Sequence, residues 1–258
     1  LPFFLRATPK LTKKLIIDII PVSLFSTGNF LLFLFGINKT TANASAIIYT
    51  ATPITVALLS GAFIGERVSR QKITGILLGL VGVMTILLLP LIEKGQVIIG
   101  DVGGNIIIIG AMIMFALYNV GTRHLTAVKS YHPITITGIS IFISAMCFDL
   151  LLLFLPHKEI LPSLLTPYNI FSTFYIAIFV TVIPYIFHQW AIKHSSATTG
   201  ALTTYIQPIF GFVINGVLLG EVITGGFLFG SILVFTGTFM GTGARMIEEI
   251  KKILQRLR

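Results

Sequence analysis

The sequence predicts an all-α membrane protein made of inverted five-helix repeats. Its parent fold would have ten helices, of which eight spans are present in this chain and the first two helices are missing. Of the 258 residues, 55% are hydrophobic and only 10% are charged, whereas soluble domains contain roughly 25% charged residues. A proline, four glycines and a glutamate also recur 155 positions later without a gap. This recurrence indicates an internal duplication.

The duplicated positions keep the same residue types in the same order. The pairs are Pro53 and Pro208, Gly61 and Gly216, Gly65 and Gly220, Glu66 and Glu221, Gly75 and Gly230, and Gly82 and Gly237. Ser69 is matched by Thr224, so the hydroxyl is kept where the residue changes. Several of these glycines lie on faces of small residues that let helices approach closely, either within the protein or at a dimer contact.

Eight segments are apolar enough to cross a bilayer, which requires about 20 residues per helix. They are 15–37, 41–64, 73–92, 103–122, 133–155, 169–192, 198–220 and 223–243. The lone cysteine, Cys147, lies inside a span without a partner. Neither a disulfide framework nor a CxxC metal or redox site is therefore available. We also expect no metal and no cofactor.

The basic residues predict how the chain is oriented. The net charge of +9 would suit a nucleic-acid partner, but its distribution along the chain favours a membrane topology. If the spans alternate in direction, only Lys39, Lys94 and Lys158 of the 18 Lys and Arg fall on one side. The positive-inside rule makes the other side cytoplasmic. We expect a multi-pass plasma-membrane protein with both ends of this chain in the cytoplasm and no nucleic-acid partner.

The repeat offset also predicts domain boundaries. The fourth span starts at 103, and subtracting 155 leaves 52 positions ahead of Leu1, room for about two helices of 20 residues each. We expect a truncated first repeat at 1–95, with helices three to five, and a second repeat at 100–244, with helices six to ten. An odd number of helices per repeat turns the second copy upside down, as in many secondary transporters.

Residues 245–258 are predicted to form a cytoplasmic, amphipathic, basic tail. Their apolar residues follow one helical stripe, and the basic residues lie elsewhere. Such a helix lies along the inner leaflet, attracted by anionic lipid. A plain extension of the last span is the alternative.

Three prolines interrupt predicted spans. Pro53 and Pro208 occupy matching positions, and Pro184 interrupts the sixth span. A proline inside a helix frees the carbonyl four residues earlier, here on Tyr49 and Thr204. Breaks at corresponding positions of two halves indicate a binding site near the middle of the membrane. A kink whose carbonyl is bonded by a nearby threonine hydroxyl is the alternative for either proline.

Polar and aromatic side chains gather near these breaks and predict a polar cavity with aromatic walls. For any single residue, the alternative is an ordinary hydrogen bond between helices, which stabilises by about 0.6 kcal/mol. The predicted substrate-binding residues are Asn29, Tyr49, Thr52, Tyr118, Asn119, Tyr185, His188, Gln189, Tyr205 and Gln207. Aromatic walls without a fixed acid suit neutral, zwitterionic or cationic ligands.

Three ionisable side chains lie inside the spans. Asp18 is interpreted as structural, because the helix N-terminus and Lys14 stabilise its charge. Asp149 lies close enough to the outer surface for pairing or snorkelling to account for it. His188 titrates near neutral pH when unperturbed, so proton or ion coupling stays open.

Glu66 and Glu221 follow glycines at the ends of matching helices, where the helix dipole disfavours a negative charge. Each glutamate can accept hydrogen bonds from the free amides of the helix that follows, and Ser69 and Thr224 are placed to cap that helix. We interpret Glu66, Ser69, Glu221 and Thr224 as structural corners.

Two stretches resemble a known family. Residues 42–83, ANASAIIYTATPITVALLSGAFIGERVSRQKITGILLGLVGV, and 197–237, ATTGALTTYIQPIFGFVINGVLLGEVITGGFLFGSILVFTG, look like the two halves of an EamA-type member of the drug/metabolite transporter superfamily. The shared signature is an Ala-rich helix with a central Pro, a Gly-Glu corner and a Gly-rich helix. The resemblance implies ten helices in inverted repeats, a central cavity, and export of small molecules without ATP.

These observations together predict a secondary transporter that exports small polar or amphipathic metabolites, amino-acid-like or amine-like, by alternating access. Translocation of lipid-linked sugars or nucleotide-sugars on the same fold is one alternative. An intramembrane lipid enzyme is another, disfavoured because HExxH and GxSxG motifs are absent from the sequence. The expected partners are a small-molecule substrate and the lipid bilayer. Either a monomer or a homodimer is compatible with the sequence.

Overall fold

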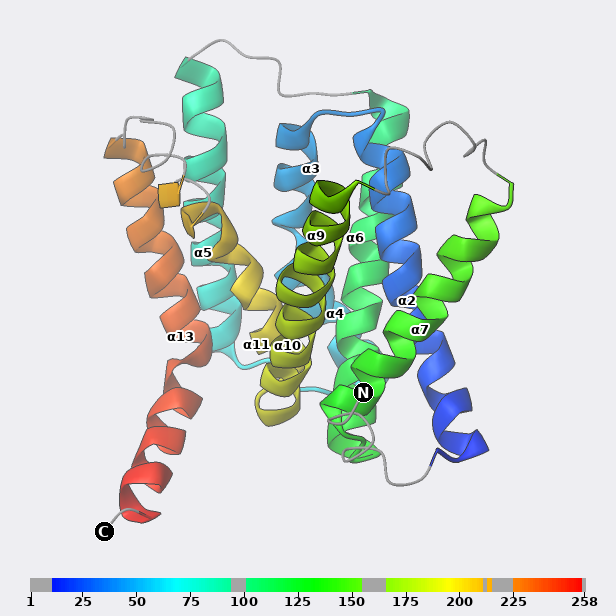
Figure 1. Ribbon diagram of the computed structural model, residues 1–258. Helices are drawn as coiled ribbons and strands as arrows, with labels where there is room; N and C mark the ends of the chain where they lie inside the picture. The colour runs from blue at the N-terminus through cyan, green and yellow to red at the C-terminus, as the bar shows by residue number, and fades with distance from the viewer. Residues whose placement is uncertain (1–10, 94–100, 155–165, 211–212, 215–224, 257–258) are drawn as a thin grey trace. The chain divides into compact units, whose positions relative to one another are not determined.

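The structure is a computed structural model that describes residues 11–93, 101–154, 166–210, 213–214 and 225–256. In these residues all regular elements are helices (Figure 1). The α-helices are α2 (Lys13–Ile37), α3 (Ala42–Tyr49), α4 (Thr52–Ile64), α5 (Arg70–Glu93), α6 (Val102–Arg123), α7 (Pro133–Leu152), α9 (Pro167–Tyr175), α10 (Ile183–His194), α11 (Ala197–Leu202) and α13 (Gly225–Arg256). Two π-helical segments, η1 (His124–Val128) and η2 (Ile176–Val182), and a 3-10 turn, η3 (Thr203–Tyr205), join some of them.

Six helical stretches in the described residues are long and apolar enough to span a membrane. They are Lys13–Ile37, Ala44–Ile64, Arg70–Leu89, Val102–Val128, Pro133–Leu152 and Pro167–His194. They coincide with the first six predicted spans, so an all-α, multi-pass architecture is confirmed. The predicted span 198–220 lies partly outside the described residues, and the last one contains a shorter apolar helix, Gly225–Gly241.

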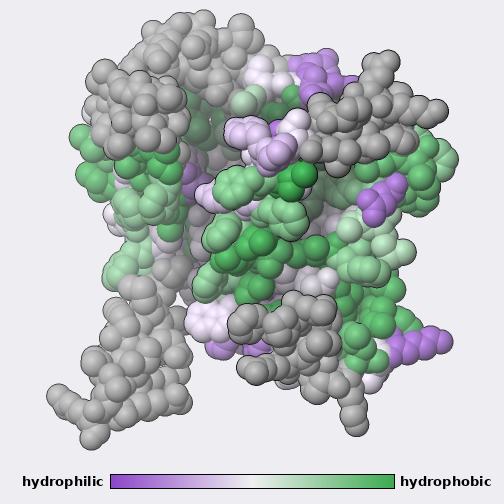
Figure 2. Space-filling model, viewed as in Figure 1, coloured by the Kyte–Doolittle hydropathy of each residue, from purple (hydrophilic) through white to green (hydrophobic). Residues whose placement is uncertain are grey.

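The surface of these helices is mostly apolar. Large hydrophobic side chains such as Leu58, Phe63, Phe142 and Phe174 are exposed. In the view of Figure 2, hydrophobic residues cover most of the coloured face. Lipid, rather than water, is the solvent that such a surface requires.

By compactness the chain divides into two units. Unit 1 comprises residues 1–28 and 121–194, and unit 2 comprises residues 29–120 and 195–258. Each unit therefore combines stretches that are far apart in the sequence. The helices α2 and α6 contribute to both units, because the boundaries fall at Gly28 and Val120 inside them.

Unit 2 is organised by the contact between α5 and α13, which lie side by side (Figure 1). Gly75 and Gly82 of α5 meet Gly237 and Gly230 of α13. A Cβ atom added to Gly75 would lie 2.5 Å from the Gly237 carbonyl oxygen, and one added to Gly82 would lie 2.7 Å from that of Gly230. The residue number rises along α5 while it falls along α13, so the two helices are antiparallel. The expected glycine faces thus pack within the protein.

A core cluster of apolar side chains surrounds this contact. It is formed by Ile76, Val83, Ile86, Leu202, Tyr205, Ile209, Phe227 and Val234, all of them buried. The α13 helix runs without a break to Arg256. Residues 245–256 of the predicted tail therefore continue the helix that begins at Gly225.

Unit 1 contains a parallel pair of helices, the first half of α2 and α7. The Ser23 and Ser140 hydroxyls lie 3.0 Å apart, and those of Thr27 and Ser144 lie 2.7 Å apart. Both pairs are separated by 117 positions, so the two helices run in the same direction. Hydroxyl bonds of this kind link membrane helices where no water is present.

We predict that Gly237→Ala destabilises the protein by about 1–3 kcal/mol, the usual cost of overpacking. The new Cβ atom would lie 2.5 Å from both the Gly75 carbonyl oxygen and the Gly79 nitrogen. Thermal unfolding in detergent micelles measures the effect as a lowered Tm.

The matched control is Gly61→Ala in α4, where the nearest atom would lie 3.8 Å away. Alanine is the better helix former by roughly 0.5–1 kcal/mol, so Gly61→Ala should leave the Tm unchanged or slightly higher. Equal Tm values for the two variants would contradict the close helix contact.

Candidate substrate site

The first proline break lies within the membrane span Ala44–Ile64. The α3 helix ends at Tyr49, and α4 begins at Thr52 with Pro53 in its first turn. The Thr52 hydroxyl donates to the Tyr49 carbonyl oxygen at 2.7 Å. That carbonyl is the one that Pro53 frees. A threonine hydroxyl therefore supplies the bond that hydrocarbon cannot.

A second break lies at the matching place, 155 positions later. The α11 helix ends at Leu202, the 3-10 turn Thr203–Tyr205 follows, and residues 207–210 around Pro208 are again helical. The hydroxyls of Thr203 and Thr204 donate to the carbonyls of Gly200 and Ala201 at 2.7 and 2.8 Å. Pro184, the third predicted break, lies in the first turn of α10, just after the π-helical segment η2.

Asn29 joins three helices of unit 2 beside the first break. Its side-chain amide on α2 donates to the Tyr49 hydroxyl of α3 at 2.6 Å and to the Ala111 carbonyl of α6 at 2.8 Å. Asn29 itself is 7% exposed. Both donors of the amide nitrogen are thus used, which leaves the Oδ1 oxygen as the acceptor of this side chain.

A row of aromatic rings continues from this amide. Tyr49 meets the edge of Phe33 at a centroid distance of 5.8 Å and meets Phe115 at 6.4 Å. Phe115 stacks on Tyr118 at 6.3 Å. Phe33, Tyr49 and Phe115 are half-buried, whereas Tyr118 is fully buried. We name Asn29, Phe33, Tyr49, Phe115 and Tyr118 the Asn29 cluster.

The Asn29 cluster contains three predicted site residues and two that sequence reasoning missed. Asn119, a further predicted residue, is buried next to Tyr118 and donates to the Phe115 carbonyl oxygen at 2.7 Å. Phe33 lies one turn after Asn29, and Phe115 lies one turn before Asn119. This helical spacing was the available signal.

The two other predicted residues of unit 2 lie after the α11 helix. The Tyr205 ring is buried against Gly79 of α5 in the core cluster, where a Cβ atom on Gly79 would lie 2.6 Å from the ring. Its hydroxyl is buried with no hydrogen-bond partner among the described residues. Gln207 is exposed. Their role in binding remains a prediction.

Tyr185, His188 and Gln189 belong to α10 in unit 1. Gln189 is fully buried, whereas Tyr185 and His188 are half-buried. The Tyr185 hydroxyl interacts with Ser26 of α2. The spacing of these three residues puts them on one face of α10, and their role in binding is likewise a prediction.

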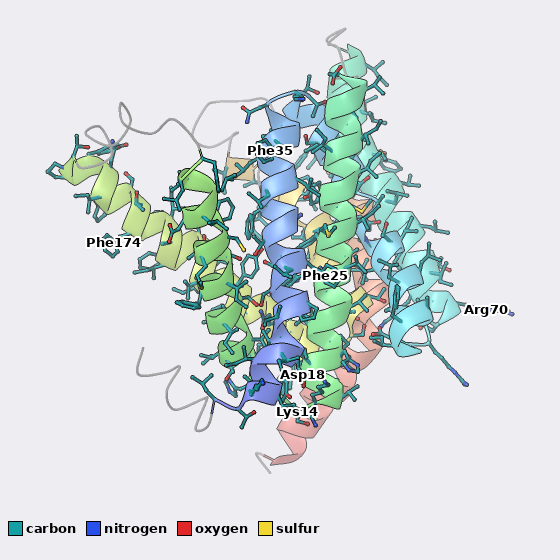
Figure 3. All side chains as sticks on the ribbon, turned by 90° about the vertical axis from the view of Figure 1, so that its right-hand side faces the viewer. Lys14, Asp18, Phe25, Phe35, Arg70 and Phe174 are labelled. Atoms are coloured by element: carbon teal, nitrogen blue, oxygen red, sulfur yellow. The ribbon has the colours of Figure 1, made fainter. Side chains whose placement is uncertain are left out.

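Asp18 has partners that the sequence did not reveal. The Lys129 ammonium lies 2.6 Å from one carboxylate oxygen, and the Tyr131 hydroxyl donates to the other at 2.7 Å. The pKa of Tyr131 is raised, because its proton is held by the Asp18 carboxylate. Lys14 lies one turn before Asp18 (Figure 3). These contacts are those of a structural ion pair.

The corner after α4 contacts the start of α11. Gly65 is left-handed, with φ of 63°, and a Glu66 side-chain oxygen accepts the Ala197 amide at 3.2 Å. Ser69 accepts the amide of Lys72 at 3.3 Å, and the Lys72 ammonium donates to Ser196 at 2.7 Å. Glu66 therefore bonds α11 rather than the following helix, because α11 begins beside α4. Glu221 and Thr224 lie outside the described residues.

Within the described residues, no group of three or more His, Cys, Asp or Glu side chains is arranged to hold a metal ion. The candidate site is instead the Asn29 cluster, in which a side-chain amide lies beside aromatic rings. Such a site binds by hydrogen bonding and ring contacts.

Comparison with known proteins gives one family. The sequence profile of the EamA-like transporter family matches residues 1–88 and 102–242. The chain is 30% identical over 225 residues to the uncharacterized transporter YetK of Bacillus subtilis. This alignment covers 84% of this chain and 64% of that protein. It is 24% identical over 226 residues to an uncharacterized transporter of Clostridium kluyveri, covering 85% and 70%. The chain thus spans about two thirds of the length of these relatives.

The fold is also found in a solved structure. A crystal structure, described only as that of a protein, superposes with a TM-score of 0.67 at 16% identity. The match covers 90% of this chain and 77% of that one. At this identity the likeness concerns the fold alone.

We predict that Asn29→Leu destabilises the protein by about 1 kcal/mol, because two interhelical hydrogen bonds of roughly 0.6 kcal/mol each are lost. Unfolding in mixed detergent micelles measures the change. The matched control is Asn38→Leu, whose amide bonds the Leu34 carbonyl at an exposed helix end. An equal loss of stability in the two variants would mean that the hydrogen bonds of Asn29 to Tyr49 and Ala111 do not stabilise the contact between the three helices.

Proposed function

This chain belongs to the EamA-like transporter family, and we propose that the protein exports small polar or amphipathic metabolites by alternating access. The family is one of transporters and not of enzymes. We infer a plasma-membrane location with both ends of this chain in the cytoplasm, from the distribution of Lys and Arg.

We further propose that the chain holds two repeats, at 1–95 and 100–244, inserted in opposite directions. The glycine contacts support this arrangement. Adding 155 to Gly75 gives Gly230, and subtracting 155 from Gly237 gives Gly82. The contact between Gly75 and Gly237 therefore maps onto the contact between Gly230 and Gly82, which is also present. A twofold axis that exchanges two antiparallel helices runs perpendicular to them, in the plane of the membrane.

The helix caps support the same relation. Thr41 caps α3 by accepting from the amide of Ala44, and Ser196 caps α11 by accepting from the amide of Thr199. Both cap and amide are 155 positions apart in the two helices. Equivalent helices thus start in the same way in the two proposed repeats.

The single observation that carries the proposed site is the break in the span Ala44–Ile64, repeated after α11. Broken helices at corresponding positions of inverted repeats are where secondary transporters bind their substrates. Next to the first break lies the Asn29 cluster, whose rings are half-buried and whose amide oxygen accepts hydrogen bonds. We propose that this cluster forms one wall of the substrate site.

The chemistry of this wall indicates a class of ligand. Asn29 Oδ1 accepts an N–H or O–H of the ligand, and the rings of Phe33, Tyr49 and Phe115 favour an ammonium or an apolar group. No Asp or Glu belongs to the cluster. Amines and amino-acid-like zwitterions carry both an N–H donor and an apolar part, and they are the class that we propose.

Counterflow in sealed proteoliposomes tests the proposal. We expect uptake of at least one member of a panel of amino acids, amines and sugar derivatives. Tyr49→Ala should lower the initial rate about tenfold, which corresponds to roughly 1.4 kcal/mol of lost binding.

The matched control is Tyr168→Ala, which removes the same side chain from an exposed position, 79% accessible, at the start of α9. Its rate should stay within about twofold of the unmodified protein. A rate that is unaffected by Tyr49→Ala would remove the Asn29 cluster from the site. The absence of counterflow for every amine and amino acid would overturn the proposed ligand class.

A further inference from the structure

An apolar groove lies in unit 1 between the start of α2 and α7, and none of its lining residues belongs to the Asn29 cluster. Its volume is about 690 Å³. The lining is apolar and consists of Leu11, Ile16, Ile20, Gly138, Ile139, Phe142 and Ile143. Phe142 is 65% exposed, so its ring forms an accessible wall. A surface of this kind is filled by hydrocarbon in a membrane.

The direction of the two helices gives the groove a charged end. Because α2 and α7 are parallel, both begin at the same end of the groove. Lys13 and Lys14 are exposed in the first turn of α2. Lys13, Ile16 and Ile20 are spaced by three and four residues and so share a face of α2. The exposed ammonium group of Lys13 therefore lies next to the apolar lining, at the end of the groove where α2 begins.

Other charges at this end are mostly positive. Lys129 pairs with Asp18, and Arg123 donates to the Lys193 carbonyl. The pKa of His132 is lowered by burial and by the positive charge of Lys193, so its ring favours the neutral form. Five basic side chains, Lys13, Lys14, Arg123, Lys129 and Lys193, thus accompany the single acid Asp18 among the described residues here. The carboxylate of Asp18 is already bonded, which leaves Lys13 available to an anion.

We propose that this groove binds an anionic phospholipid. One acyl chain lies along Ile16, Ile20 and Phe142, and the phosphate lies at Lys13. The apolar lining accounts for the chain, and the excess of positive charge accounts for the preference for an anionic headgroup. Gly138 has no side chain and leaves room for the acyl chain of the lipid to approach the α7 backbone.

A tryptophan reporter in the groove tests this proposal. Trp190 is the only tryptophan of the chain, so Trp190→Phe provides a background without signal. Phe142→Trp then places the reporter in the groove, and Phe174→Trp gives a matched control on α9 (Figure 3), at a residue that is 63% exposed. The protein is reconstituted in phosphatidylcholine vesicles that contain brominated phosphatidylglycerol or brominated phosphatidylcholine, whose bromines quench by contact.

At position 142, half-maximal quenching should need about fivefold less brominated phosphatidylglycerol than brominated phosphatidylcholine, the factor expected from one lysine at an anionic headgroup. Lys13→Gln should bring this ratio close to one, and so should high salt. At position 174 the ratio should be close to one throughout. Ile20→Trp provides a second reporter on the opposite wall if Phe142→Trp does not fold.

Two results would overturn the proposal. A ratio close to one at both positions 142 and 20 would mean that the groove does not select an anionic headgroup. Weaker quenching by both lipids at these positions than at 174 would mean that protein, such as a second copy of the chain, covers the groove instead.

Discussion

The close crossing of α5 and α13 is the contact on which the arrangement of unit 2 depends. Glycines at four positions allow backbone to meet backbone, so the helices approach to a distance at which any side chain would collide. Lipid provides little drive for apolar helices to associate, so close packing of small residues supplies the attraction. The core cluster includes side chains of both helices and the Tyr205 ring, which packs against Gly79.

The second constraint is that backbone groups in hydrocarbon need partners. At the first proline break of unit 2, the Thr52 hydroxyl donates to the Tyr49 carbonyl that Pro53 frees. At the end of α11, the hydroxyls of Thr203 and Thr204 donate to the carbonyls of Gly200 and Ala201. The bond from Thr52 leaves the Tyr49 side chain to bond Asn29. Thr52, Tyr49 and Asn29 thus supply partners both for the free backbone carbonyl of Tyr49 and for the polar side chain of Asn29 within the membrane span.

The sequence predicted those features that depend on composition and local spacing. Six spans, both proline breaks and the glycine faces follow from hydrophobicity, from the chemistry of proline and from the 155-residue period. The partners of Asp18 did not follow, because Lys129 and Tyr131 lie more than 100 positions away and are brought close only by tertiary packing. Phe33 and Phe115 were missed for a related reason, since an apolar ring in a span carries no signal until its neighbours are known.

The central claim is that the two repeats enter the membrane in opposite directions. Lys39 and His194 test it directly, because they lie 155 positions apart and both are exposed. In a Cys147→Ser background, single cysteines at these two positions are treated with a membrane-impermeant maleimide in sealed, uniformly oriented vesicles. The account predicts that only one of the two cysteines reacts before the vesicles are opened. Reaction of both from the same side would contradict it.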